Sequence, residues 1–288
     1  MNVDFVRFAA SDGVQLRGWY SDCPGETAVV HVHGMSGNGY ENYFLDNQRK
    51  AYSEAGISFL TFDNRGSGII NHFKSRDGVK LGGSCFEIFE ESAHDIQGAI
   101  DFAKSKGKTK FILQGHSLGG SKVVNYSLNS PNTGVIGAIL LAPTDMAGWA
   151  NTDHKHSEYL DKAHKLIAQG KSEELVGAQC WLDKTPLSAR TYPSICEAGT
   201  AVDIYAPRDG ESLISKVKVP MIIIYGDKDI GEEKIDGNAK AWQDRVSKLI
   251  NRLTEIKIIP GANHGFSGLE DQLAKVLLDF VNRATGNA

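Results

Sequence analysis

Eight short apolar runs, rich in β-branched and aromatic residues, are the feature that most restricts how this chain can fold. Longer segments separate most of them, and over 86–104 the apolar residues recur at helical spacings of three and four. Runs that are apolar throughout are typical of strands in a parallel sheet covered by helices. The expected strands are 3–9, 14–20, 27–32, 57–62, 109–113, 135–141, 219–225 and 255–259. We predict an α/β fold with a mainly parallel eight-stranded sheet flanked by helices, opened by an antiparallel hairpin.

The stretch 145–215 breaks this alternation. It has no convincing core strand, and the pieces 157–169 and 172–178 have a helical pattern. A stretch this long without a core strand is typical of an inserted cap rather than of a plain loop. We therefore expect core residues at 1–144, a helical cap at 145–215 inserted after the sixth strand, and further core residues at 216–288. One or two of five dispersed cap aromatics are expected to line a pocket: Trp149, Tyr159, Trp181, Tyr192 and Tyr205.

Charge and composition exclude several classes of protein. The net charge is −4, from 31 Lys+Arg and 35 Asp+Glu, and no long basic run appears, so we expect no nucleic-acid partner. The apolar runs are far shorter than the roughly 18 residues of a membrane helix, and the first residues do not read as a secretory signal. The four cysteines are scattered without a C-x-x-C pair, which is typical of reduced thiols. We expect a cytoplasmic protein with no membrane partner.

The segment Gly115-His116-Ser117-Leu118-Gly119 contains the pattern G-x-S-x-G. It follows the expected strand 109–113 and precedes a helical segment. Small residues on both sides of the serine permit a tight, strained turn that points Oγ outward, and a helix N-terminus directly behind it can stabilise an oxyanion. We predict that Ser117 is a nucleophile. The structural alternative is a serine that caps a helix after a glycine-rich turn.

Four motifs, in order, resemble those of the α/β-hydrolase superfamily, in particular its serine esterase and acyl-hydrolase branches. They are His31-Val32-His33-Gly34, Asp63-Asn64-Arg65-Gly66-Ser67-Gly68, Gly115 to Gly119, and Gly226-Asp227-Lys228-Asp229 followed by His264. The resemblance covers nearly the whole chain apart from the cap, and it implies the order serine, acid, histidine. It therefore implies that His264 is the base and Asp229 the acid. Asp227 and Asp145 remain alternative acids.

The resemblance also implies an oxyanion hole made by the backbone N–H groups of Leu118 and Met35. Leu118 follows the nucleophile, and Met35 follows the expected strand 27–32 and its His33-Gly34 extension. Such donors act where negative charge develops in the transition state. The loop from Asp63 to Gly68 does not match G-x-S-x-G, and we interpret it as structural, with Asn64 or Arg65 as candidates to face the pocket.

These motifs predict a serine-dependent hydrolase, a carboxylesterase acting on a small to medium carboxylic ester. The ester is inferred by analogy, because ester cleavage is the commonest activity on this scaffold. Thioesterase, lactonase or C–C bond hydrolase activity with the same triad are alternatives, and a non-catalytic α/β-hydrolase-like binding protein is the alternative of another class. No cofactor and no metal are expected, because nucleotide-binding motifs and H-E-x-x-H are absent. The oligomeric state is left open.

Overall fold

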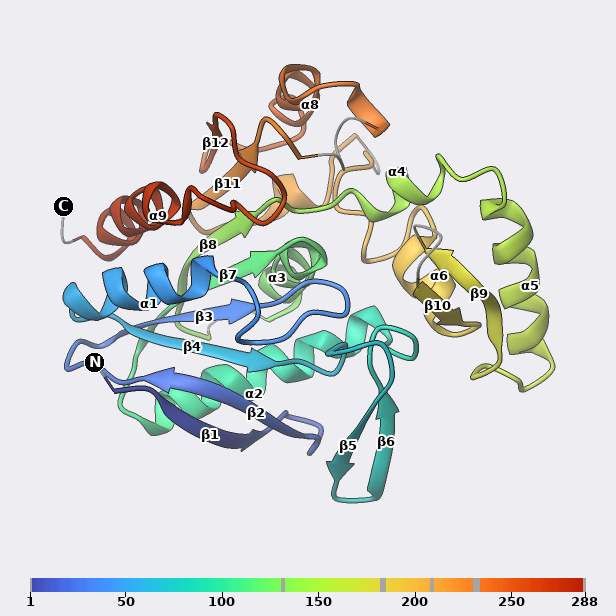
Figure 1. Cartoon of the computed structure of the whole chain (residues 1–288), viewed down its shortest axis with the longest axis horizontal. Helices are drawn as coiled ribbons and strands as arrows, with labels where there is room; N and C mark the ends of the chain where they lie inside the picture. The colour runs from blue at the N-terminus through green and yellow to red at the C-terminus, as the bar shows by residue number, and fades with distance from the viewer. Residues whose placement is uncertain (1, 131–132, 182–184, 208–209, 230–233, 287–288) are drawn as a thin grey trace.

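An eight-stranded sheet forms the centre of the computed structural model, which describes residues 2–130, 133–181, 185–207, 210–229 and 234–286 (Figure 1). The spatial order of the strands is β1-β2-β4-β3-β7-β8-β11-β12. Each lies within three residues of its predicted bounds: β1 Asp4–Ala9, β2 Gln15–Ser21, β3 Thr27–Val32, β4 Ser58–Asp63, β7 Lys110–His116, β8 Val135–Leu141, β11 Met221–Gly226 and β12 Thr254–Ile259. The mainly parallel sheet predicted from the sequence is confirmed.

Most neighbouring strands of the sheet are parallel, and the antiparallel pairs lie at one edge. Strand β2 pairs antiparallel with β1 and β4, and every pair from β4 to β12 is parallel. Strands β3, β4 and β11 are buried along their whole length, as expected for strands with helices on both faces. Because parallel strands end at the same edge, the loops that follow β3, β7, β8, β11 and β12 are brought close together there.

Helices cover both faces of the sheet (Figure 1). Helices α1 and α9 pack against each other, and α2 packs against α3. The bounds are α1 Phe44–Glu54, α2 Ser92–Ser105, α3 Leu118–Asn129, α8 Ala239–Val246 and α9 Glu270–Thr285, with short 3₁₀ turns at Phe89–Glu91 and Ile214–Lys216. Helix α1 was not predicted. Helix α8 starts after Asn238, whose side chain accepts a hydrogen bond from the Ala241 N–H, and it ends at Val246.

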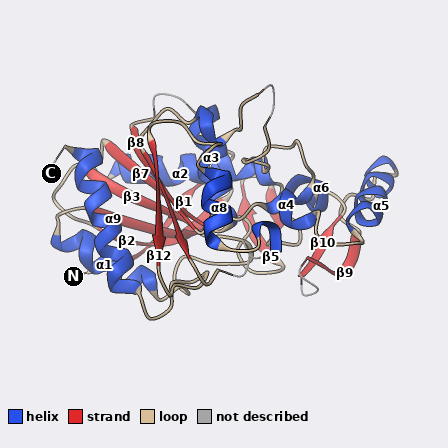
Figure 2. Ribbon diagram, turned by 90° about the horizontal axis from the view of Figure 1, so that it is seen from above, coloured by secondary structure: helices blue, strands red, loops and turns tan. Residues whose placement is uncertain are grey.

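Residues 146–196 form a group of elements beyond the carboxyl ends of the parallel strands, and Figure 2 shows most of this group at the opposite end of the molecule from both termini. Its elements are α4 Met146–Ala150, α5 His156–Ala168, β9 Leu175–Trp181, β10 Thr185–Ser188 and α6 Thr191–Cys196. They share an apolar cluster that also contains Leu118 and Phe89 from the core. This cluster therefore joins the cap to the start of helix α3.

The predicted helix over 172–178 is wrong. Residues Leu175–Trp181 form strand β9, which pairs antiparallel with β10. Cys180 and Trp181 are buried in the cap cluster, so pairing with β10 and burial override the helical spacing of the local sequence. The elements between Met146 and Cys196 are thus helices together with a β-hairpin, and not helices alone. A second hairpin outside the main sheet, β5 Asn71–Ser75 with β6 Gly78–Gly82, was also not predicted.

Candidate active site

Ser117 occupies a sharp turn between strand β7 and helix α3. Its φ of 56° and ψ of −126° lie in a region that side chains rarely adopt. The flanking glycines permit the turn: a Cβ on Gly115 would lie 2.2 Å from the Gly119 carbonyl oxygen, and a Cβ on Gly119 would lie 2.1 Å from that of Val32. The chain can pass this close to itself only with glycine at these two positions.

The Ser117 hydroxyl lies at the N-terminus of α3. Leu118 is the first residue of this helix, so its N–H has no acceptor inside the helix. The Ser117 Oγ is 3.1 Å from the Thr144 Oγ1, which belongs to the loop after β8. Among the described residues no hydrogen bond joins Ser117 to His264. The serine is therefore held by a hydroxyl in this structure, and not by an imidazole.

His264 and Asp229 form a close pair at the same edge of the sheet. The Asp229 Oδ2 lies 2.7 Å from the His264 Nδ1, with the carboxylate side chain only 2% exposed and the imidazole 38% exposed. Asp229 follows β11, and His264 follows β12, so two neighbouring parallel strands bring them together. A buried carboxylate on Nδ1 holds the imidazole orientation and leaves Nε2 available for another partner.

The two alternative acids have other contacts. The Asp227 Oδ1 accepts a hydrogen bond of 2.6 Å from the Gly261 N–H and so holds the loop that leads to His264. Asp145 begins α4, where it accepts from the Gly148 N–H and pairs with Arg245 at 3.1 Å. Of the three carboxylates, Asp229 is the one that contacts His264.

One pocket of about 340 Å³ contains the side chains of Ser117, Asp229 and His264. The rest of its wall is Met35, Ser36, Thr144, Met146, Trp149, Trp181 and Thr185. Two of the five cap aromatics, Trp149 and Trp181, line it, in agreement with the number expected, and their ring centroids are 5.9 Å apart. The wall thus contains apolar and aromatic side chains, and the Thr144 hydroxyl lies next to Ser117.

Gly34 lies directly against Ser117. A Cβ added to Gly34 would be 2.8 Å from the Ser117 Cβ and 3.3 Å from its Oγ. The next residue, Met35, lines the pocket, so the Gly34–Met35 peptide and the first turn of α3 flank the serine from two sides. This arrangement suits two backbone donors to an oxyanion formed at Ser117.

Comparison with known proteins places the chain in a family. The family described as "Protein of unknown function (DUF1749)" matches residues 82–284. The chain belongs to this family. A curated relative, the uncharacterized protein YfhR of Escherichia coli (strain K12), is 25% identical over 148 residues. That match spans about half of each protein, 48% of this chain and 46% of YfhR.

Solved structures show the fold of this DUF1749 chain. Est1E from Butyrivibrio proteoclasticus, solved with ferulic acid, is 18% identical, with a TM-score of 0.68 over 97% of this chain and 99% of that one. The α/β hydrolase GrgF from Penicillium sp. sh18 is 17% identical, with a TM-score of 0.71 over 99% and 100%. A thermostable carboxyl esterase from Bacillus coagulans is 17% identical, with a TM-score of 0.68 over 99% of both chains. The chain has the α/β-hydrolase fold.

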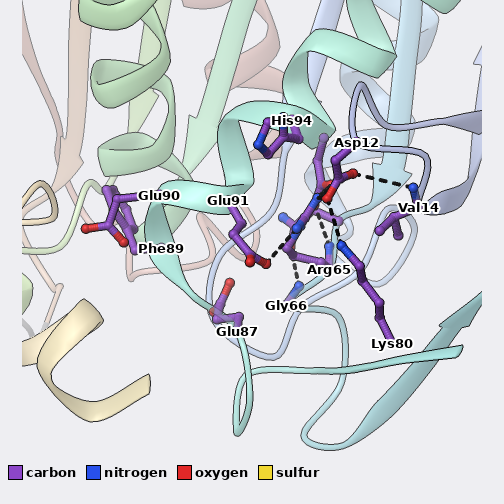
Figure 3. Close-up of polar contacts among 12 residues, drawn as sticks. Asp12, Val14, Arg65, Gly66, Lys80, Glu87, Phe89, Glu90, Glu91 and His94 are labelled. Carbon is purple, nitrogen blue, oxygen red and sulfur yellow. Dashed lines mark hydrogen bonds and ion pairs between the residues drawn. The ribbon is translucent and has the colours of Figure 1, made fainter. Parts of the chain in front are cut away.

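The loop from Asp63 to Gly68 of the DUF1749 chain is held by buried polar contacts. Arg65 is bound by three carboxylates, those of Asp95, Asp12 and Glu91, at 2.7 to 3.2 Å, and Figure 3 shows the last two around its guanidinium. Neither Asn64 nor Arg65 lines the pocket that contains Ser117. The two residues therefore support the loop, and the suggestion that one of them faces the pocket is wrong.

His116 has a role in the geometry that the sequence does not reveal. Its Nε2 lies 2.8 Å from the His264 carbonyl oxygen, and the two rings are 4.9 Å apart. Burial and the neighbouring His264 lower the pKa of His116 to about 3, so the ring is neutral and donates its Nε2 proton to that carbonyl. Thr144 was also missed, because nothing in the local sequence shows that its hydroxyl meets Ser117.

In the part of the chain that the structure describes, no three His, Cys, Asp or Glu side chains are arranged to hold an ion. Among the same residues, no helix is long and apolar enough to span a membrane.

Proposed function

We propose that this chain is a serine hydrolase, a carboxylesterase that cleaves small to medium carboxylic esters through an acyl-enzyme on Ser117. The observation that carries the proposal is that Ser117 and the hydrogen-bonded pair of His264 and Asp229 line the same pocket. A serine hydroxyl is a weak nucleophile by itself and needs an adjacent base whose orientation a third group holds. The fold and its esterase neighbours agree with this reading.

The chemistry uses five groups: the side chains of Ser117, His264 and Asp229, and two backbone N–H groups. Ser117 leaves its contact with Thr144, and His264 Nε2 takes its proton as Oγ attacks the ester carbonyl carbon. The N–H groups of Leu118 and Met35 stabilise the oxyanion. When the tetrahedral intermediate collapses, His264 gives the proton to the departing alcohol. Water, deprotonated by His264, then attacks the acyl carbonyl carbon. The bond to the Ser117 Oγ breaks, His264 returns the proton to Oγ, and the acid is released, while Asp229 stabilises the imidazolium.

The pocket supports a substrate of modest size. Its volume of about 340 Å³ lies at the small end of ligand pockets. Two methionines and two tryptophans are among its lining residues. We infer that the acyl group is apolar and that the cap limits its length.

Hydrolysis of p-nitrophenyl esters, from acetate to decanoate, tests the proposal. The wild type should prefer one chain length, and Ser117→Ala and His264→Ala should lower kcat/KM by roughly 10³-fold or more. A matched control, His164→Ala, removes an exposed histidine outside the pocket and should keep most of the activity. Full activity in Ser117→Ala would exclude this mechanism.

A fluorophosphonate probe separates the remaining alternatives. If it labels Ser117 but no p-nitrophenyl ester is cleaved, the nucleophile stands and thioesters, lactones and β-diketones are the substrates to try. If it labels nothing and no ester is cleaved, the binding-protein alternative replaces the proposal.

A further inference from the structure

The peptide group between Gly34 and Met35 has a fixed direction. The Gly34 carbonyl oxygen lies 2.8 Å from the His33 Nδ1, and a carbonyl can only accept a hydrogen bond. No peptide bond in the described residues is cis, so the Met35 N–H points opposite to this carbonyl. The hydrogen bond from His33 therefore sets the direction of the N–H that flanks Ser117.

This hydrogen bond requires one form of the His33 ring. The Asn64 backbone N–H donates to the His33 Nε2 at 3.0 Å, so Nε2 carries no proton and Nδ1 carries one. A second ring proton would meet the Asn64 N–H, donor against donor. Burial, together with the positive charge of Lys122, lowers the pKa of His33 to about 3 and keeps the ring neutral.

Asn64 connects His33 to a buried ion pair. Its Nδ2 donates to the His33 carbonyl at 3.2 Å, and its Oδ1 accepts from the Lys122 Nζ at 3.4 Å. The Lys122 Nζ lies 2.6 Å from the Glu87 Oε2, and both side chains are 0% exposed. Lys122 is on α3, the helix that starts directly after Ser117. The contacts thus join the helix behind the serine to the loop that carries Met35.

A buried ion pair is weak evidence for stability, because removing two charges from water offsets much of their attraction. Apolar residues of similar volume are often equally stable at such sites. The Asn64 Oδ1 also accepts from the Gly66 N–H at 2.9 Å. What an apolar pair cannot supply is the second donor to this oxygen, from Lys122, and a positive charge near His33. The Lys122–Glu87 pair is therefore better explained by the groups that it positions than by its contribution to stability.

We propose that Lys122 and Glu87 are positioning residues that act through Asn64 and His33 to aim the Met35 N–H at the oxyanion. This inference rests on the proposed function, because Met35 is a donor only if Ser117 forms a tetrahedral intermediate. The expected effect of losing the pair is a lower kcat with little change in KM, since the donor acts on the transition state and not on the bound ester.

The test removes both charges together, so that neither is left buried alone. Lys122→Met/Glu87→Met should fold and should lower kcat about 10- to 100-fold, up to the loss expected for one oxyanion donor, with KM within about twofold. Lys108→Met is the matched control: this lysine is also buried and bonds the Gly25 carbonyl at 3.0 Å, but belongs to the loop that precedes β7, at its opposite end from Ser117. It should leave kcat unchanged.

A spectroscopic readout makes the result independent of catalysis. In ¹⁵N-histidine-labelled wild type, His33 should show a protonated Nδ1 and an unprotonated Nε2, with no substrate present. In the double variant this single tautomer should be lost. Unchanged His33 signals together with unchanged kcat would overturn the proposal.

The two readouts distinguish the failure of each idea. If ester hydrolysis depends on Ser117 while the double variant matches the wild type in kcat and in His33 signals, the proposed function stands and the positioning role is wrong. If no ester is cleaved and Ser117 is not labelled, the proposed function fails, and the positioning role in catalysis fails with it.

Discussion

Backbone strain in this molecule is concentrated in the loops around Ser117. The four non-glycine residues with positive φ in the described chain are Ser36, Ser117, Ala142 and Phe266, at 43° to 56°. Each lies in a loop that follows a parallel strand at the pocket edge of the sheet. Such conformations cost roughly 1–3 kcal/mol each, and they persist only where the surrounding packing holds them. The strained residues that lower the stability of the fold thus lie in the loops at the edge of the sheet where the pocket is.

The two carboxylates after β11 give a matched pair of substitutions. Asp229→Asn should lower kcat/KM by about 10³- to 10⁴-fold, because an amide no longer holds the imidazole tautomer or stabilises the imidazolium. Asp227→Asn removes the same charge two residues away, where the carboxylate accepts from the Gly261 N–H and does not contact His264, and should cost less than about 10-fold. Steady-state kinetics on the preferred ester measure both. Equal losses would show that Asp229 is not the acid.

Helix α3 can lie close to β3 because its second residue, Gly119, has no side chain. A Cβ on Gly119 would come within 2.1 Å of the Val32 carbonyl oxygen, and backbone on both sides leaves no flexible neighbour to move aside. The start of the helix is therefore set by contact with the strand that leads to Met35. The same element thus carries Ser117, Leu118 and, through Lys122, the buried ion pair.

Gly119→Ala should lower the free energy of unfolding by about 1–3 kcal/mol or more, because the added carbon overpacks the contact between α3 and β3. Gly265→Ala is the control for stability: its added carbon would meet nothing closer than 3.6 Å, and it should change stability by less than about 0.5 kcal/mol. Urea unfolding measures both. A neutral Gly119→Ala would mean that the helix can shift without cost.

The cap contributes the far wall of the pocket through Trp149 on α4 and Trp181 on β9. Trp181→Ala should move the preferred p-nitrophenyl ester to a longer acyl chain, because the truncation opens space. Each further methylene that fills this space is worth about 1–3 kcal/mol of discrimination. Tyr159→Ala alters a cap aromatic outside the pocket and should leave the preference unchanged. An unaltered chain-length profile for Trp181→Ala would show that the acyl group does not reach it.

Three buried histidines link the stability of the whole molecule to pH. Burial, the largest cause, lowers the pKa of His33 and of His116 to about 3 and holds that of His31 well below its usual value. The unfolded chain takes up these protons below about pH 6.5, whereas the folded chain does not until far lower pH. Because the unfolded state binds more protons, stability falls as the pH is lowered through this window.

The expected slope is about 1.4 kcal/mol per pH unit for each histidine, and about 4 kcal/mol for the three together, between about pH 6 and 4. Urea unfolding at a series of pH values measures it. His116→Gln should remove about one third of the slope, and His154→Gln, which alters an exposed histidine, should not change it. A stability that is flat between pH 7 and 5 would contradict neutral buried rings.

Local sequence was sufficient for the sheet, because its central strands are apolar runs that must be buried and its edge strands are marked by β-branched and aromatic residues. It was also sufficient for the turn at Ser117, where Gly115 and Gly119 mark a backbone that passes within van der Waals contact of itself. The loop after β4 was correctly interpreted as structural, although its partners could not be named. Helix α1 and the two small hairpins were missed, and β9 was taken for a helix, because their local periodicity is weak and distant partners decide them.

By itself, the sequence determined the order of the strands along the chain and the place of the sharp serine turn, since both follow from patterns within a few neighbouring residues. Only the tertiary structure decided which carboxylate meets His264, which hydroxyl meets Ser117, and how Lys122 is connected to Met35. Asp229 and His264 are 35 residues apart, Asn64 and His33 are 31 apart, and Lys122 and Glu87 are 35 apart. Such contacts depend on where parallel strands end in space, and that is set by the packing of the whole sheet.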